Sequence, residues 1–368
     1  MNTPQEFADL LAGVQRLAAG GFAGGGGALA TLTETRGSTF RRAGARMLVC
    51  ADGTVVRGLS GGCPEADIVG RAREVIADGA ARIVRYDRES GLDALIELGC
   101  GGELEVLIEP LRGPRDTAFL DAVAACLADR RSGVLASVFR KDGAVLAPTP
   151  RRLVIDEGRI VHNGFGAGLI SGLLADLASE RVGPGPSRDT FEHGGSRWDV
   201  LLEPLIAPFR LHVFGINSGA LALARIGAGL GWEVLLVDDQ AGRPLPAPVP
   251  ARVRHVAVPP NEVADRLAFD ARSFAVVMTH HLGRDVDYLR ALRAAPLAYL
   301  GAIGSRKRVQ RLSDGSGLDA DALHAPAGLD LGSETPEEIA LAIAAEIVAA
   351  VHGRRGGPLR DSGGPIHA

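Results

Sequence analysis

The sequence predicts an α/β protein in which an amino-terminal α+β domain precedes a doubly wound parallel sheet. A chain of 368 residues with 46% hydrophobic residues is long enough for two cores. The first half contains Asp52-Gly53 between two apolar runs, which is a strong hairpin signal. The second half alternates short apolar strands with helical patterns, which is typical of a parallel sheet. We therefore expect domains over 1–205 and 209–353 and a flexible tail over 354–368.

The first domain is expected to open with a helix, because Phe7, Leu10 and Val14 recur at helical spacing. Its expected elements are, in order, a helix over 7–17, a strand over 28–32, hairpin strands over 46–50 and 54–56, a helix over 65–78 and a strand over 104–108. The phrase Glu-Pro-Leu occurs at 109–111 and again at 203–205. This echo suggests that the two strands it closes are neighbours in one sheet. Residues 204–208 are predicted to form the linker between the two domains.

The second domain is expected to be a Rossmann-like sheet. Its predicted strands lie over 211–214, 233–237, 253–258, 275–279 and 297–303. The last helix begins at Thr335-Pro336, where a threonine cap, a proline at the first position and Glu338 form a capping box. We expect it to run to about His352.

Composition excludes several classes of protein. The formal charge of −4 leaves no basic surplus for a phosphate backbone, so we expect no nucleic-acid partner. Four cysteines in so long a chain do not make a disulfide scaffold, which favours a reduced, cytoplasmic protein. The amino terminus lacks the pattern of a signal peptide, and no uncharged apolar stretch reaches the roughly 18 residues needed to span a membrane.

Two cysteines lie in glycine-rich segments, Ser60–Glu65 and Leu98–Glu103, that are the leading candidates for chemistry. Glycines such as Gly61, Gly62 and Gly101 remove side chains and let a ligand approach the backbone. Cys63 precedes Pro64 at a predicted helix start, where the helix dipole favours a thiolate that can bind metal or attack. Cys100 has glycines at three of its four nearest positions, so the argument from glycine applies to it as well. The alternative is that each cysteine is only a small residue in a tight turn.

The other two cysteines, Cys50 and Cys126, lie in apolar runs and are predicted to belong to the core.

A basic loop precedes the hairpin. It contains Ser38 together with Arg41, Arg42 and Arg46. Arginine offers two parallel hydrogen bonds to phosphate oxygens, so this loop is a candidate phosphate site. A solvated basic loop is the simpler alternative.

The second domain contains Gly215-Ile216-Asn217-Ser218-Gly219-Ala220 directly after a predicted strand. A dinucleotide fingerprint belongs at this place, but Asn217 stands where the middle glycine admits the pyrophosphate. Asp238, at the end of the next strand, could hold a ribose hydroxyl. The fold prediction is unaffected, whereas dinucleotide binding in the usual pose is disfavoured.

Two further groups follow strands at the ligand-binding edge of this sheet. Thr279, His280 and His281 end one strand, and one histidine could face the crevice. Ser305 and Arg306 follow the next strand and enter a helix, which could form an anion cradle or an exposed basic turn.

Taken together, these sequence motifs resemble those of the XdhC/CoxI family, whose members mature molybdenum hydroxylases. The resemblance rests on ordered matches along nearly the whole chain. They comprise Gly37–Arg41, Ser60–Glu65, Gly99–Gly102, the segments around Gly215, Asp238 and Thr279–His281, then Gly301–Arg308, Gly328–Gly332 and Thr335–Ala340. The sequence departs from the family pattern at Phe40, Pro64, Asn217, Ser218 and His281. Three of these departures surround the expected Rossmann crevice, so this domain could bind a different ligand from its relatives, or none.

The resemblance implies a protein that binds the molybdenum cofactor (molybdopterin), protects it during sulfuration and delivers it to an apo molybdenum hydroxylase. Cys63 and Cys100 would contact the metal or its sulfur, a cysteine desulfurase would be a further partner, and a homodimer is expected. The alternative is an NAD(P)-dependent oxidoreductase, with Asp238 on the ribose and His280 or His281 as proton carrier. A structural partner of a larger assembly is a third reading, in which both cysteines are dispensable.

Overall fold

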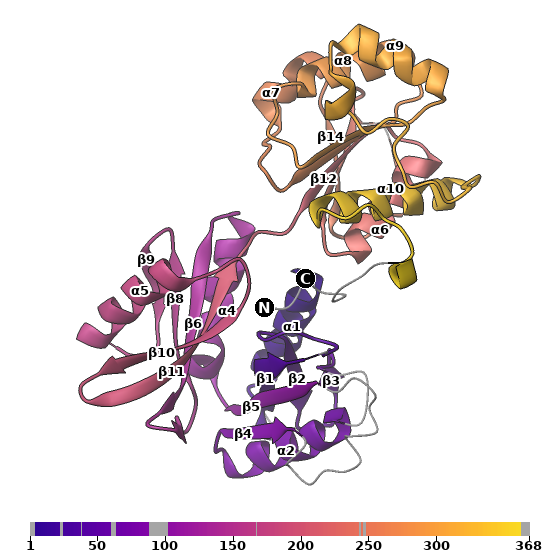
Figure 1. Ribbon diagram of the computed structural model, residues 1–368. Coiled ribbons are helices and arrows are strands. Elements are labelled where there is room, and N and C mark those ends of the chain that lie inside the picture. The colour runs from indigo at the N-terminus through magenta and orange to yellow at the C-terminus, as the bar shows by residue number, and fades with distance from the viewer. Residues whose placement is uncertain are drawn as a thin grey trace. The chain divides into compact units, whose positions relative to one another are not determined.

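The computed structural model describes residues 4–22, 25–37, 39–59, 64–87, 102–166, 168–242, 244–245 and 248–361. The chain forms two compact units, Met1–Ala207 and Pro208–Ala368 (Figure 1). Pro204 and Leu205 belong to a strand, so the predicted linker is too long at its start.

The first half of the amino-terminal unit contains one antiparallel sheet, which we call sheet A. Its elements are α1 (Pro4–Ala19), β1 (Gly27–Arg36), β2 (Arg46–Cys50), β3 (Val55–Val56), α2 (Pro64–Asp78), β4 (Arg82–Tyr86) and β5 (Glu103–Leu111). The strand order is β3-β2-β1-β5-β4. The predicted hairpin is confirmed, since β2 and β3 pair around Asp52-Gly53. The two helices and the long strands predicted in this half are also present.

The second half of this unit contains a second antiparallel sheet, sheet B. Its elements are α4 (Pro114–Ala128), β6 (Gly133–Lys141), β7 (Ala144–Val145), β8 (Arg151–Asp156), β9 (Arg159–Asn163), α5 (Leu169–Arg181), β10 (Ser187–His193) and β11 (Ser196–Leu205). The main strand order is β10-β11-β6-β8-β9, with β7 paired to β6.

The two halves are tandem copies of one arrangement. Among the described residues of each half, a helix precedes three strands, a second helix and two more strands. The strand order in each sheet is third, second, first, fifth, fourth once the short β7 is set aside. The strand registers also agree, because Gly27 pairs with Leu111 in sheet A and Gly133 pairs with Leu205 in sheet B. Each of these central pairs is interrupted by a bulge near its far end.

This duplication corrects the expectation drawn from the repeated Glu-Pro-Leu. The strands β5 and β11 that carry it lie in different sheets, where they hold equivalent places. Glu109 therefore corresponds to Glu203, and Arg46 on β2 corresponds to Arg152 on β8, because they pair with Thr31 and Ser137 at matching positions.

Helices cover the outer face of each sheet. Ile68, Ala72 and Val75 of α2 pack on sheet A, and Leu174 and Ala178 of α5 pack on sheet B. The inner faces share a core to which α1 and α4 contribute. Farther along β5 and β11, the equivalent residues Leu107 and Leu201 form a small buried cluster with Phe139. This cluster continues the core between the two sheets. The predictions for Cys50 and Cys126 are confirmed, since both are buried.

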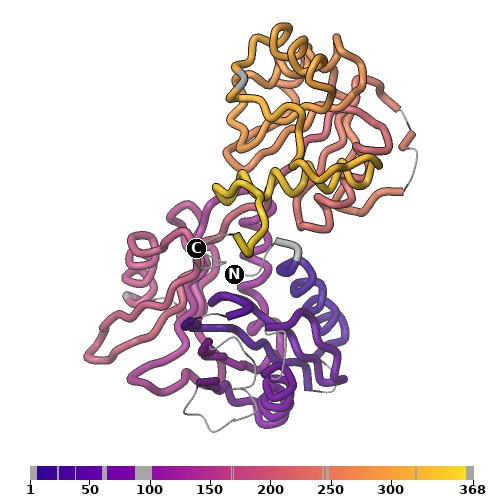
Figure 2. The backbone as a smooth tube through the Cα atoms, turned by 45° about the vertical axis from the view of Figure 1, so that its right-hand side comes forward, coloured from indigo at the N-terminus to yellow at the C-terminus, as the bar shows by residue number. Residues whose placement is uncertain are grey.

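The carboxyl-terminal unit is a parallel five-stranded sheet, sheet C, with helices on both faces. Its strands are β12 (Arg210–Phe214), β13 (Glu233–Asp238), β14 (Val253–Ala257), β15 (Ser273–Val277) and β16 (Tyr299–Ala302), in the order β14-β13-β12-β15-β16. Its main helices are α6 (Ser218–Gly229), α7 (Val263–Arg266), α8 (Leu282–Leu292), α9 (Arg306–Ser316) and α10 (Pro336–Val351). Figures 1 and 2 show α10 beside α6 on one face of this sheet, whereas α8 and α9 pack on the other. The predicted capping box is present, since Thr335 and Glu338 cap α10 reciprocally.

Candidate functional site

The structure describes the flanks of the two Gly-Cys segments. Six predicted site residues lie outside the described residues: Ser38, Gly61, Gly62, Cys63, Cys100 and Gly101. The helix α2 begins at Pro64, as the sequence predicts. A carboxylate oxygen of Glu65 accepts a hydrogen bond from the amide of Leu59 at 3.1 Å. This bond joins the two ends of the segment that contains Cys63.

The elements that carry the two segments touch one another. Tyr86 is the last residue of β4 and pairs with Leu104 of β5, which directly follows the segment that contains Cys100. Asp67 lies in the first turn of α2. The hydroxyl of Tyr86 donates a hydrogen bond to Asp67 at 2.8 Å. Burial, and then this hydrogen bond, raise the pKa of Tyr86, so the phenol remains a donor at neutral pH. The described flanks of both cysteine segments therefore meet.

A charged pocket lies at the end of sheet A where β4 ends and β5 begins. Its volume is about 110 Å³, and its lining residues are Glu34, Arg36, Arg85, Asp87, Glu103, Leu104 and Glu105. Asp87 and Glu103 flank the segment that contains Cys100. Arg36 and Arg85 are largely exposed, and their Nε atoms donate to Glu34 and Glu105. The pocket thus presents charges of both signs around Glu103, the described end of that segment.

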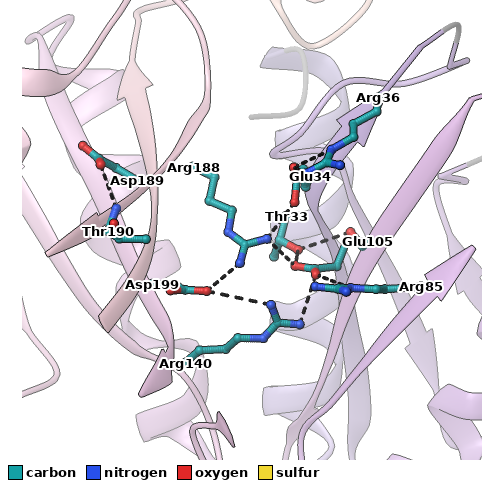
Figure 3. Close-up of polar contacts among 10 residues, drawn as sticks. All are labelled: Thr33, Glu34, Arg36, Arg85, Glu105, Arg140, Arg188, Asp189, Thr190 and Asp199. Carbon is teal, nitrogen blue, oxygen red and sulfur yellow. Dashed lines mark hydrogen bonds and ion pairs between the residues drawn. The ribbon is translucent and has the colours of Figure 1, made fainter. Parts of the chain in front are cut away.

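Glu105 is the centre of an ion-pair network that joins the two sheets (Figure 3). Its carboxylate is almost fully buried and accepts hydrogen bonds from Thr33 at 2.8 Å, Arg140 at 3.0 Å and Arg188 at 3.2 Å. Burial raises the pKa of Glu105, but Thr33 and the surrounding arginines outweigh it and lower the pKa below its ordinary value. Arg188 also donates to Asp199 at 2.5 Å, and Asp199 is the sheet B counterpart of Glu105. The network therefore connects the pocket residues Glu34 and Glu105 to Arg140 and Arg188 of sheet B.

Only some of the arginines in the basic loop are available to a ligand. Arg42 is exposed, and Arg41 forms an ion pair with Glu6 at 2.5 Å. Arg46 is only 2% exposed and forms two hydrogen bonds with Glu203, at 2.8 and 2.5 Å. The prediction that Arg46 holds a phosphate is therefore wrong, because its charge is buried and already paired between the sheets.

The start of α6 explains how Asn217 changes the dinucleotide fingerprint. The Asn217 side chain caps the helix by accepting from the amide of Ala220 at 3.0 Å, and it donates to the carbonyl of Met278 at 2.7 Å. A pyrophosphate would need the helix amides and the space that this side chain occupies. Gly215 is required for close packing, because a Cβ there would lie 2.8 Å from the Met278 oxygen. These residues do not fit NAD(P) in the usual pose.

The crevice beside this helix start is small. It measures about 60 Å³ and is lined by Gly215, Ile216, Val237, Asp238, Asp239, Thr279, Arg284 and Tyr288. Asp238 is buried at the end of β13, as the sequence predicts. Asp239 forms an ion pair with Arg284 at 2.9 Å. Ser218 is the first residue of α6. The structure thus brings Gly215, Asp238 and Thr279 together.

The two histidines have different environments. His281 caps α8 by accepting from the amide of Arg284 at 3.3 Å. His280 is exposed and has a positive φ of 63°, a conformation that non-glycine residues rarely adopt. Beside them, the buried Asp285 accepts from the Thr279 hydroxyl and from Arg308, both at 2.6 Å. One nitrogen of the predicted proton carrier His281 is therefore engaged in the helix cap.

The predicted anion cradle is also partly occupied by the chain itself. Ser305 caps α9 by accepting from the amide of Arg308 at 3.4 Å. Arg306 is exposed at the first position of that helix.

Sequence reasoning missed Glu105 and the pair formed by Tyr86 and Asp67. A signal was present for Glu105, because a lone carboxylate interrupts the apolar strand Leu104–Ile108. Within the described parts of the chain, no three metal-ligating side chains cluster, and no helix has the length and apolar character needed to cross a membrane.

Comparisons with known proteins agree with this architecture. The model described as the XdhC and CoxI family matches residues 23–87, and that described as the XdhC Rossmann domain matches residues 211–347. A Bacillus subtilis protein whose name describes a probable subunit of xanthine dehydrogenase is 26% identical over 322 residues, which are 87% of this chain and 92% of its own. The molybdenum cofactor insertion chaperone PaoD of Escherichia coli is 26% identical over 330 residues, 88% of this chain and 83% of its own.

A solved structure has the same fold. A crystal structure titled as a xanthine dehydrogenase of Bacillus halodurans superposes with a TM-score of 0.73, covers 93% of this chain and 96% of its own, and is 24% identical. The chain is thus an α/β protein with a Rossmann-type unit. It belongs to the XdhC/CoxI family, which confirms the resemblance.

Proposed function

We propose that this protein binds the molybdenum cofactor, protects it while a sulfido ligand is installed and delivers it to an apo molybdenum hydroxylase. The name of the Escherichia coli relative describes cofactor insertion, and the alignment spans most of both chains. The observation that carries the proposal is the contact between Tyr86 and Asp67, which brings the flanks of both Gly-Cys segments together. Two thiols that share one site could hold the metal or the sulfur that is transferred to it.

The charges near these segments suit a transfer site. A thiolate at the start of α2 would be stabilised by the helix dipole. The exposed guanidinium group of Arg85 lines the pocket that contains Glu103 and could bind the phosphate or the oxo groups of the cargo. Arg42, which is exposed in the basic loop, is a further candidate. In this proposal the protein is a chaperone without turnover and acts in the cytoplasm, a cysteine desulfurase is the donor of the sulfur, and a homodimer is the working form.

Retention of the cargo tests the proposal. The full chain is loaded with molybdopterin and, separately, with nicotinamide dinucleotides, and the small molecules released after purification are measured by mass spectrometry. We expect the wild type to retain molybdopterin and both Cys63→Ala and Cys100→Ala to lose most of it. Cys126→Ala is the matched control, because burial and Asp156 raise the pKa of that thiol to about 11 and it is not a thiolate at neutral pH.

Retention that does not depend on either glycine-flanked cysteine would reject the assignment of the thiols. Retention of a dinucleotide instead of molybdopterin would favour the oxidoreductase. Asn217 argues against that result, because its side chain fills the pyrophosphate position.

A further inference from the structure

A further pocket lies at the opposite end of α2 from Pro64. Its volume is about 560 Å³, and its lining residues are Phe22, Gly25, Ala51, Arg73, Ile76, Ala77 and Arg112. This volume is within the range of sites for small molecules. Among the described lining residues two are arginines and none is a carboxylate, so this lining has a net positive charge.

Arg112 is held in place at this pocket. Its Nη2 atom donates to the carbonyl oxygens of Ile76 at 3.0 Å and Ala77 at 3.4 Å, at the end of α2. Gly79 has a φ of +74°, and a Cβ there would overlap the guanidinium group. Because both partners are neutral carbonyls, they orient the guanidinium without cancelling its charge.

Arg73 supplies the second positive charge. It is exposed, and it forms no ion pair or hydrogen bond with the residues that the structure describes. The carboxylates nearest to it along α2 are engaged elsewhere, since Glu74 and Asp78 both pair with Arg82. The turn that contains Asp52 lies beside Arg73, since a Cβ on Gly53 would be 3.7 Å from Arg73 Nη2. The Asp52 carboxylate accepts from the amide of Thr54 and forms no ion pair with Arg73 in the described structure. Arg73 is therefore available for an anionic ligand.

The remaining wall is apolar and contains a strained aromatic residue. Phe22 has a φ of 57°, which is unusual for a bulky side chain. Such strain persists where the surrounding structure enforces it, often at ligand sites. With Ile76 and Ala51, the ring of Phe22 provides a surface for a flat apolar group.

We propose that this pocket binds a phosphate monoester of a flat ring compound, with Arg73 and Arg112 on the phosphate and Phe22 against the ring. Guanidinium groups match the oxygen geometry of phosphate. Residues 64 and 76 are separated by about 18 Å along the helix axis. The pocket is therefore distinct from the proposed cargo site and does not depend on that function.

Adenosine monophosphate is the probe for this site. Binding to the full-length protein is measured by isothermal titration calorimetry, with adenosine and inorganic phosphate titrated separately. We expect the monophosphate to bind at least about tenfold more tightly than either fragment. Arg73→Ala should weaken its binding about tenfold or more, and Ala77→Trp, which fills the pocket from an exposed helix position, should abolish it.

Arg159→Ala is the matched control, since it removes an exposed arginine from β9 in the other repeat. Displacement of the probe by molybdopterin would identify the pterin phosphate as a ligand of the pocket, and no displacement would favour a nucleotide. The proposal is overturned if the wild type binds no adenosine monophosphate at millimolar concentration. It is equally overturned if Arg73→Ala and Ala77→Trp bind it as the wild type does, because the ligand would then lie elsewhere, for example in the Rossmann unit.

Discussion

Arg46 and Arg152 occupy equivalent positions in the two repeats of the amino-terminal unit, and each pairs with the glutamate of the opposite sheet. Arg46 of sheet A binds Glu203 of sheet B, and Arg152 of sheet B binds Glu109 of sheet A. All four side chains are buried. The duplication therefore produces two reciprocal ion pairs across one interface, and these pairs specify how the sheets face each other.

The first prediction concerns removal of one member of these pairs. Glu203→Gln leaves the buried charge of Arg46 without its counterion, so we expect the free energy of unfolding to fall by about 3–5 kcal/mol. Glu109→Gln should cost a similar amount because its environment is equivalent. Urea denaturation measures both changes.

An exposed pair provides the control for this prediction. Glu74→Gln removes an ion pair with Arg82 that is open to solvent, and we expect a change of less than about 1 kcal/mol. Equal effects of Glu203→Gln and Glu74→Gln would contradict the role of the buried pairs.

The second prediction is a loss of stability in acid that depends on Glu105. Its pKa in the folded protein lies below the ordinary value of 4.5, since Thr33 and the arginines outweigh burial. The carboxylate therefore stabilises the fold above pH 4.5, and this contribution is lost as the pH falls through the lower folded value. Unfolding free energies measured between about pH 6 and about pH 3 should fall less steeply for Glu105→Gln than for the wild type. Parallel curves for the two proteins would show that other carboxylates carry the effect.

The third prediction tests the cap formed by Asn217. Asn217→Ala removes the acceptor for the Ala220 amide, so we expect it to destabilise the carboxyl-terminal unit by about 0.5–2 kcal/mol. Asn217→Gly should cost less and should leave the helix amides open to an anion. Thermal unfolding with and without NAD⁺ distinguishes the helix-capping role of Asn217 from its obstruction of the dinucleotide site. Stabilisation of Asn217→Gly but not of the wild type by NAD⁺ would show that the side chain blocks the site.

The structural elements that the sequence predicts correctly are those specified by a few neighbouring residues. The hairpin at Asp52-Gly53 and the capping box at Thr335 follow from a few neighbouring residues, and both are present. The repeat was not recognised, because its strongest trace is only the recurrence of Glu-Pro-Leu. Equivalent strands in two sheets keep the same register and burial while most of their residue types differ. A short echo in sequence therefore indicated similarity but could not tell neighbours from counterparts.

The remaining errors in the predicted site arise because residues that are far apart in the sequence interact in the structure. Proximity in the sequence groups Arg46 with Arg41 and Arg42, but its partner Glu203 is 157 residues away. The sequence predicts that Arg46 begins a strand, but nothing near it in the sequence shows that its side chain is buried against a carboxylate. The sequence shows Asn217 as an obstacle to a dinucleotide, whereas its bond to Met278 depends on the parallel packing of β12 and β15.

The last prediction concerns the link between the two Gly-Cys segments. Tyr86→Phe removes the hydroxyl that donates to Asp67 while it preserves the buried ring, so the flanks of the segments lose their connection. We expect the fold to lose about 1 kcal/mol, and we expect retention of molybdopterin to fall severalfold. Tyr299→Phe is the matched control, because it removes a similar bond from a buried tyrosine to Glu346 in the other unit. If both variants have the same loss of stability but only Tyr86→Phe releases the cargo, this bond positions the site. Equal retention by Tyr86→Phe and Tyr299→Phe would mean that the two segments are held together by other contacts.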